Sequence, residues 1–174
     1  YHSVMLERIA RFSEAHQDAI EVPERLFHGG LHRGLIALDP ELGQGLGVWF
    51  QKDITGAAHF CVSRNTQPST GTPYPDTAPS IYEVSLRVKK FAVFPDERSL
   101  YQMGSEEPGD DEDLQFKPAD LQNLQNVRRA LVAAGYDGIH LMREGTFSAI
   151  DSRAIAIIKE HDPFPIYNTH IRPK

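Results

Sequence analysis

Four residues in the N-terminal half, His28, Gly29, Trp49 and Phe60, have the chemistry needed to bind a flat polar ligand. A short apolar segment ends in His28, Gly29 and Gly30, and the aromatic residues Trp49 and Phe60 follow. A glycine lets the backbone approach a ligand closely and offer it an N–H donor and a C=O acceptor. Aromatic faces can stack on planar rings and attract cations. Each residue also has an ordinary structural use, as a turn histidine or as core aromatics, so their context decides between the two.

The pattern before residue 65 predicts short elements around these residues. Apolar residues at three- to four-residue spacing predict a helix over 3–19, which Pro23 follows. Residues 26–28 and 48–50 are short apolar segments typical of strands, with a glycine-rich loop between them. Thr55 is placed to cap a helix that reaches about residue 62.

The C-terminal part predicts a second helix and several strands. Residues 64–80 are rich in Pro, Ser and Thr and predict a loop, and the alternation over 81–94 predicts one strand. The acidic run 104–113 lacks the ligand spacing of a calcium loop and is typical of a solvated loop. A helix is expected over 119–134 with Gly135 as its cap, followed by strands at 139–142, 147–150 and 154–158. Without strict βαβ alternation, this order favours an α+β fold with antiparallel or mixed sheets.

The order and spacing of these motifs resemble those of the poly(ADP-ribose) polymerases. That family has a strand ending in His-Gly, then Gly-x-Gly-Ile-Tyr-Phe, then a helix ending in Ala-x-Tyr-Cys. Here residues 45–50 are Gly-Leu-Gly-Val-Trp-Phe and residues 57–61 are Ala-Ala-His-Phe-Cys. The strand from Tyr82 with the later Gly-Tyr-Asp-Gly-Ile at 135–139 is similar to small bacterial and phage ADP-ribosyltransferase domains. The resemblance covers roughly residues 24–158.

The resemblance implies a fold and an activity. The fold would be an ADP-ribosyltransferase-like split β-sandwich of two small sheets with flanking helices, in a single domain over 1–174. The activity would be that of an NAD+-dependent mono-ADP-ribosyltransferase of the diphtheria-toxin type, a bacterial toxin or effector that uses NAD as its substrate and needs no metal. By this resemblance, Gly29 of this chain would bind the nicotinamide carboxamide, and Trp49 and Phe60 would stack on the nicotinamide ring. His28 would bind a ribose hydroxyl. Two further NAD-binding positions would be Ala57 and Thr146.

The resemblance is weakest at the catalytic acid. The family places a glutamate at the start of a late strand, and matching 147–151 to that strand puts Thr146 at its position. Glu144 lies two residues earlier. Side chains two residues apart on a strand point to the same face, so Glu144 would face the same way as Thr146 and is the candidate transition-state stabiliser beside His28. A surface charge on a turn is the equal alternative for Glu144. Asp137 and Asp151 are weaker candidates, since both fit turn or strand-end positions. Trp49 and Phe60 stand where the family has two tyrosines. Both are aromatic and could still stack on the nicotinamide ring, but neither has the hydroxyl group of a tyrosine.

Composition limits the partners. The chain has 174 residues, a net charge of −6 and one cysteine, Cys61. An acidic domain is a poor general binder of nucleic acid, so a protein acceptor is favoured over a nucleic acid, and its identity is open. A lone cysteine forms no internal disulfide and no cysteine-rich zinc site. No apolar run approaches a membrane span, so a soluble protein is expected, in the cytoplasm or delivered into a target cell's cytosol.

Two other functions fit the same residues. The first is a catalytically inactive module that binds NAD+ or ADP-ribose, which the missing glutamate favours. The second is an NAD+ glycohydrolase, which would give the sugar to water. The sequence does not indicate the oligomeric state.

Overall fold

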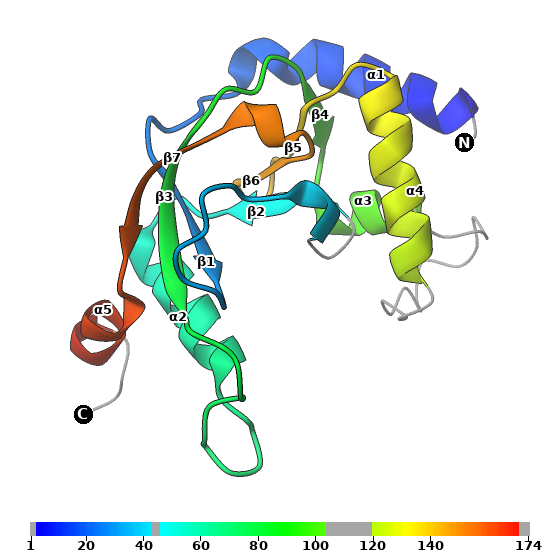
Figure 1. The fold of residues 1–174 in the computed structure, drawn as a ribbon. Coiled ribbons are helices and arrows are strands. Elements are labelled where there is room, and N and C mark those ends of the chain that lie inside the picture. Colours follow the sequence, from blue (N-terminus) through cyan, green and yellow to red (C-terminus); the bar gives the residue numbers. More distant parts are fainter. Residues whose placement is uncertain (1–2, 43–45, 104–119, 171–174) are drawn as a thin grey trace. The chain divides into compact units, whose positions relative to one another are not determined.

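The chain folds into two compact units, each built from separate segments of sequence. The computed structural model describes residues 3–42, 46–103 and 120–170. The first unit combines 1–22, 39–49 and 87–154, and the second combines 23–38, 50–86 and 155–174. Each unit has its own small sheet with flanking helices (Figure 1). The predicted α+β class is therefore confirmed, with one antiparallel and one mixed sheet.

The first unit contains a four-stranded sheet in the order β2-β6-β5-β4. Strands β4 and β5 are parallel, and β5 and β6 are antiparallel. Its elements are α1 (Ser3–His16), η1 (Gln17–Ala19), η2 (Pro40–Leu42), β2 (Val48–Phe50), β4 (Phe91–Phe94), α3 (Glu97–Met103), α4 (Asp120–Ala133), β5 (Gly138–Leu141), β6 (Thr146–Ala149) and η3 (Ser152–Ala154).

The two predicted long helices are confirmed, and their apolar residues form much of the core of this unit. In α4, Leu124, Val127 and Leu131 are fully buried, as the helical spacing predicted. The helix ends at Ala133, and Gly135 follows with a φ of 96°, a left-handed conformation that suits glycine at a helix C-terminus. The N–H of Tyr136 donates to the carbonyl of Leu131 and closes the last turn.

The second unit contains the antiparallel sheet β1-β3-β7 and two helices. Its elements are β1 (Leu26–Gly30), α2 (Ile54–Asn65), β3 (Ser80–Leu86), β7 (Ile155–His161) and α5 (Pro163–His170). Helix α2 runs along β1 and β3 (Figure 1). Its cap is Asp53, whose carboxylate accepts a hydrogen bond from the N–H of Thr55 at 2.9 Å. The expected Thr55 cap was therefore wrong by two residues, because an aspartate competes well for this position.

The expected single strand over 81–94 is two strands in different sheets, β3 and β4. Between them, the carboxylate of Asp137 accepts hydrogen bonds from the backbone N–H groups of Lys89 at 2.9 and 3.1 Å and Lys90 at 2.8 Å. A distant side chain thus replaces the ladder that a continuous strand would need. Helices α3 and α5 were not predicted, and the acidic run 104–113 lies outside the described residues.

A buried hydroxyl joins α1 to its sheet. Ser13 is buried, with 1% of its surface exposed. Its Oγ accepts a hydrogen bond from the N–H of Val93 at 2.8 Å. We expect Ser13→Ala to lower the free energy of unfolding by about 1–3 kcal/mol, because the N–H of Val93 would remain buried without its acceptor. Chemical denaturation measures this. The exposed Ser63→Ala on α2 is the control, and equal stability of the two variants would contradict the expectation.

Candidate functional site

The candidate site is built on a close approach of β1 to α2. Gly29 is buried, and a Cβ at this position would overlap the carbonyl oxygen of Ala57 and lie 3.2 Å from the Cβ of Cys61. Ala57 itself is fully buried, with no side chain beyond its methyl group to separate the two elements. Two small residues that the sequence placed near a ligand therefore have a packing role first. Burial raises the pKa of the Cys61 thiol to about 11, so it stays protonated near neutral pH.

The backbone of Gly29 faces an edge of the sheet. Phe27 exchanges hydrogen bonds with Gln51 at 2.9 and 2.8 Å, on the side of β1 away from β3. Backbone groups of successive strand residues point to opposite edges, so the N–H and C=O of Gly29 face the same way as those of Phe27. Among the described residues, β1 is the outer strand of its sheet, and the bridge to Gln51 involves Phe27 alone. Gly29 thus directs a donor and an acceptor side by side toward this edge, while the residue as a whole is buried.

Phe60 lies on the exposed flank of α2. Its side chain is 41% exposed, so the alternative of a core phenylalanine does not hold. On the helix, Ala57 and Cys61 form the face beneath Gly29, and Ala58 and Val62 lie to one side of that face and are buried. Phe60 lies to the other side. Gly56, one helical turn before Phe60, lies against the side-chain oxygen of Gln51, the residue that bridges to Phe27 at the edge of β1 away from β3. The Phe60 flank of α2 is therefore on the side of that edge.

His28 points away from α2. It alternates with Gly29, which faces the helix, so its ring lies on the other face of the sheet. The ring is half-buried and meets Phe50 edge-on, with centroids 5.9 Å apart. Within the second unit, His28 and Gly29 on β1 and Ala57 and Phe60 on α2 come from two neighbouring elements. The role of His28 toward a ribose stays a prediction.

The remaining predicted residues belong to the first unit. Trp49 is half-buried in β2 and packs against that unit's core, so part of its surface has a structural use. The motif glycine Gly47 has a φ of 89°, and a Cβ there would overlap the carbonyl oxygen of Ala149. Thr146 begins β6, where its carbonyl accepts a hydrogen bond from the Nδ1 of His140 at 3.0 Å.

Glu144 does not lie in a strand, so the argument from strand-face parity was wrong. It is exposed, in the turn between β5 and β6, and Gly145 follows with a φ of 66°. Its carboxylate accepts a hydrogen bond from the N–H of Glu97, the first residue of α3, at 3.0 Å. A carboxylate at a helix N-terminus satisfies a backbone donor and interacts well with the helix dipole. A catalytic role for Glu144 stays a prediction beside this local one.

The two weaker acid candidates have structural partners. Asp137 holds the turn before β4, as described above. Asp151 accepts hydrogen bonds from the guanidinium of Arg153, which lowers the pKa of its carboxyl group. Both fit the turn positions that the sequence indicated for them.

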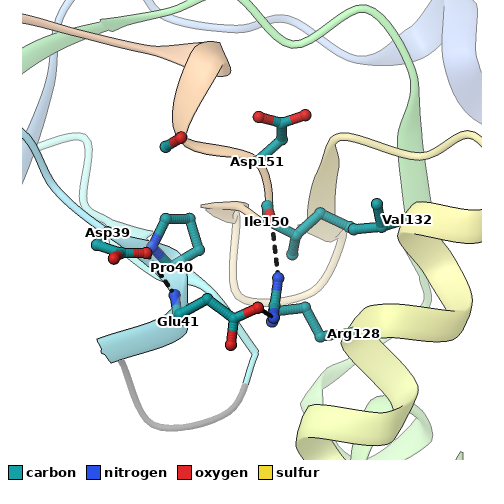
Figure 2. A pocket seen from close by; sticks show the side chains of 8 residues that line it. Asp39, Pro40, Glu41, Arg128, Val132, Ile150 and Asp151 are labelled. Atoms are coloured by element: carbon teal, nitrogen blue, oxygen red, sulfur yellow. Dashed lines mark hydrogen bonds and ion pairs between the residues drawn. The ribbon is translucent and has the colours of Figure 1, made fainter.

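A shallow pocket of about 190 Å³ in the first unit has a different character. Figure 2 shows the guanidinium of Arg128 pointing from α4 toward Glu41 and the backbone at Ile150. It pairs with Glu41 and donates to the carbonyl of Ile150 at 3.3 Å. Arg128 is 6% exposed, and its Nε has no partner among the described residues. The arginine joins α4 to η2 and to the end of β6, so we assign it a structural role.

Sequence reasoning missed Gln51 and Arg64 in the second unit. Gln51 ends the bridge to β1, and a Cβ at Gly56 would overlap its side-chain oxygen. The guanidinium of Arg64 lies 4.7 Å from the centroid of the Phe60 ring. The four-residue spacing of Phe60 and Arg64 was a signal for this contact. Over the described ranges, no cluster of metal-ligating side chains occurs, and no helix is long and apolar enough to cross a membrane.

Comparisons with known proteins identify the fold. No protein-family model matches the chain, and no curated protein sequence matches it. A solved structure does match, that of the M. tuberculosis MbcT–MbcA toxin–antitoxin complex. The chain has the fold of a protein from that complex. The TM-score is 0.57 over 96% of this chain and 97% of the other, at 12% sequence identity. The likeness confirms the predicted arrangement of two small sheets with flanking helices and, at this identity, shows the fold alone.

The close contact of β1 with α2 makes a clear prediction. We expect Gly29→Ala to lower the free energy of unfolding by about 1–3 kcal/mol, because its methyl group would push against helix backbone, which yields little. Gly30→Ala is the matched control, since the nearest atoms to a Cβ there are side-chain atoms at 3.6 to 3.8 Å. Thermal and urea denaturation of both variants measure the difference. Two variants of wild-type stability would show that β1 and α2 are not in close contact.

Proposed function

We propose that the chain binds NAD+ along the free edge of β1 and transfers ADP-ribose to a macromolecular acceptor, releasing nicotinamide. The observation that carries the proposal is the orientation of Gly29, whose N–H and C=O face that edge. A carboxamide is the complementary group, because it carries one C=O acceptor and one NH₂ donor. Phe60 adjoins the same edge and can stack on the cationic ring of nicotinamide. The motif resemblance and the toxin fold support the same function.

The reaction would break the bond between the nicotinamide nitrogen and the ribose carbon. The electron pair of that bond leaves with nicotinamide, and the sugar passes through a transition state close to an oxocarbenium ion, as in glycoside hydrolysis. A nucleophilic atom of the acceptor then forms the new bond and loses its proton. In this proposal Gly29 and Phe60 hold the leaving group, while His28 binds a ribose hydroxyl. Ala57 packs beneath Gly29 and supports its position, and the roles of Trp49 and Thr146 toward NAD+ stay predictions.

The fold also supports a biological setting. The matching structure is a toxin–antitoxin complex. We therefore propose that the chain acts as a toxin domain and that a protein antitoxin neutralises it. The acidic character of the chain, with a net charge of −6, favours protein over nucleic acid as the acceptor.

A second candidate is an inactive module that binds NAD+ or ADP-ribose. Two observations favour it: Thr146 begins β6 where the family has its glutamate, and the carboxylate of Glu144 is bound to the start of α3. A threonine hydroxyl can hydrogen-bond to a sugar, but it brings no negative charge to a developing cation.

The first test measures nicotinamide release from NAD+ by the purified chain, with and without cell lysate. We expect release that requires lysate, with label from the adenine ring of NAD+ appearing on an acceptor. Phe60→Ala should lower the rate on the order of tenfold, through loss of stacking. Val132→Ala, similarly exposed at 40%, is the control. Release without lysate would indicate a glycohydrolase instead, and binding without release would indicate the inactive module.

The second test concerns the acid. We expect Glu144→Gln to lower nicotinamide release by about 10²–10³ while NAD+ binding is retained, because only the negative charge is removed. The glutamine oxygen can still accept the hydrogen bond from Glu97, so α3 should keep its start. Circular dichroism and calorimetric NAD+ titration check fold and binding. Turnover at the wild-type rate would leave Glu144 with its local role only.

A further inference from the structure

Arg64 has no carboxylate partner within the part of the chain that the structure describes. Its exposed guanidinium lies over the ring of Phe60, 4.7 Å from the centroid. Among the described residues, no acidic side chain lies within ion-pair distance of it. Two other arginines of the second unit do have partners: Arg25 lies 3.3 Å from Glu83, and Arg33 lies 3.8 Å from Asp162. The chain has an excess of acidic residues, with a net charge of −6. An arginine beside the candidate binding edge that pairs with none of those described is therefore available for a negatively charged ligand.

The helix places Arg64 beside the free edge of β1. It lies one turn after Phe60, on the exposed flank of α2 that adjoins that edge. A guanidinium at this place repels a cationic ring stacked on Phe60, so it opposes the binding of nicotinamide alone. The repulsion disappears when the guanidinium pairs with negative charge. In NAD+, two phosphate groups begin one ribose away from the nicotinamide ring.

We infer that Arg64 binds the diphosphate of NAD+. The inference rests on the proposed function and deepens it, since it assigns the phosphates to a residue outside the sequence motifs. A guanidinium suits this role because its planar N–H groups bond phosphate oxygens in pairs and stay charged. The stacked contact with Phe60 holds the side chain beside the edge before the ligand arrives. Arg64 is thus a substrate-binding residue that makes the site prefer the dinucleotide over its cationic fragment.

The test compares two ligands on one variant. We expect Arg64→Gln to weaken NAD+ binding about tenfold, the loss of one charge-assisted hydrogen bond at an exposed site. The same variant should bind nicotinamide riboside, which carries the cationic ring without phosphate, as well as wild type or up to about twofold tighter. Calorimetry at low and at high salt measures both, and added salt should shrink the NAD+ effect. Arg64→Lys keeps the charge and should recover part of the affinity.

A control separates the outcomes. Arg33→Gln removes an exposed arginine of the same unit that already has a carboxylate neighbour, and it should leave both affinities unchanged. If Arg64→Gln binds NAD+ as tightly as wild type while wild type binds both ligands, the inference is wrong and the proposed function stands. If Arg33→Gln shows the loss instead, the phosphates lie at the other arginine. If wild type binds neither ligand, the proposed function fails, and the inference with it.

Discussion

The contact between Gly29 and the backbone of α2 is the constraint on which the candidate site depends. Because β1 lies directly on the carbonyl of Ala57, the strand and the helix have one relative position with no room to slide. That position sets which helix residues are buried beneath the sheet and which flank its edge. It therefore leaves Phe60 and Arg64 exposed beside the backbone groups of Gly29. A larger residue at 29 would push the strand and the helix apart.

The same reasoning explains why both motif glycines need their residue type without any ligand. Gly29 avoids a helix backbone, and Gly47 combines a left-handed φ with a close approach to Ala149. A fold that must pass backbone against backbone at such points keeps glycines there whatever its activity. The glycine motifs are thus evidence for the fold first. Evidence for function comes from the direction in which Gly29 presents its N–H and C=O groups.

Sequence reasoning predicted the elements well where one local pattern decides the structure. The helices at 3–19 and 119–134 and the strands around 26–28 and 48–50 have clear periodicity or clear breakers, and the structure contains them. Sequence reasoning failed where a side chain outside the local pattern determines where an element begins or ends. Asp137 divides the expected strand over 81–94, and Asp53 replaces Thr55 as a cap. For the candidate site, Gly29, Ala57 and Phe60 lie on neighbouring elements, and their roles toward a ligand stay predictions. The argument from strand alternation failed for Glu144, because a turn with Gly145 in the left-handed region does not alternate as a strand does.

Glu144 and Arg64 differ in how much each would have to move to take the role proposed for it. A transition state with positive charge on the sugar gains from a nearby carboxylate, yet β6 begins with a neutral threonine and Glu144 is bound to α3. A rotation that frees Glu144 loses its bond to the helix start, a modest cost for an exposed carboxylate. Arg64 requires no such exchange, since its guanidinium is already exposed and no carboxylate of the described residues pairs with it. Under the proposed function, binding of the dinucleotide would therefore need less rearrangement than catalysis would.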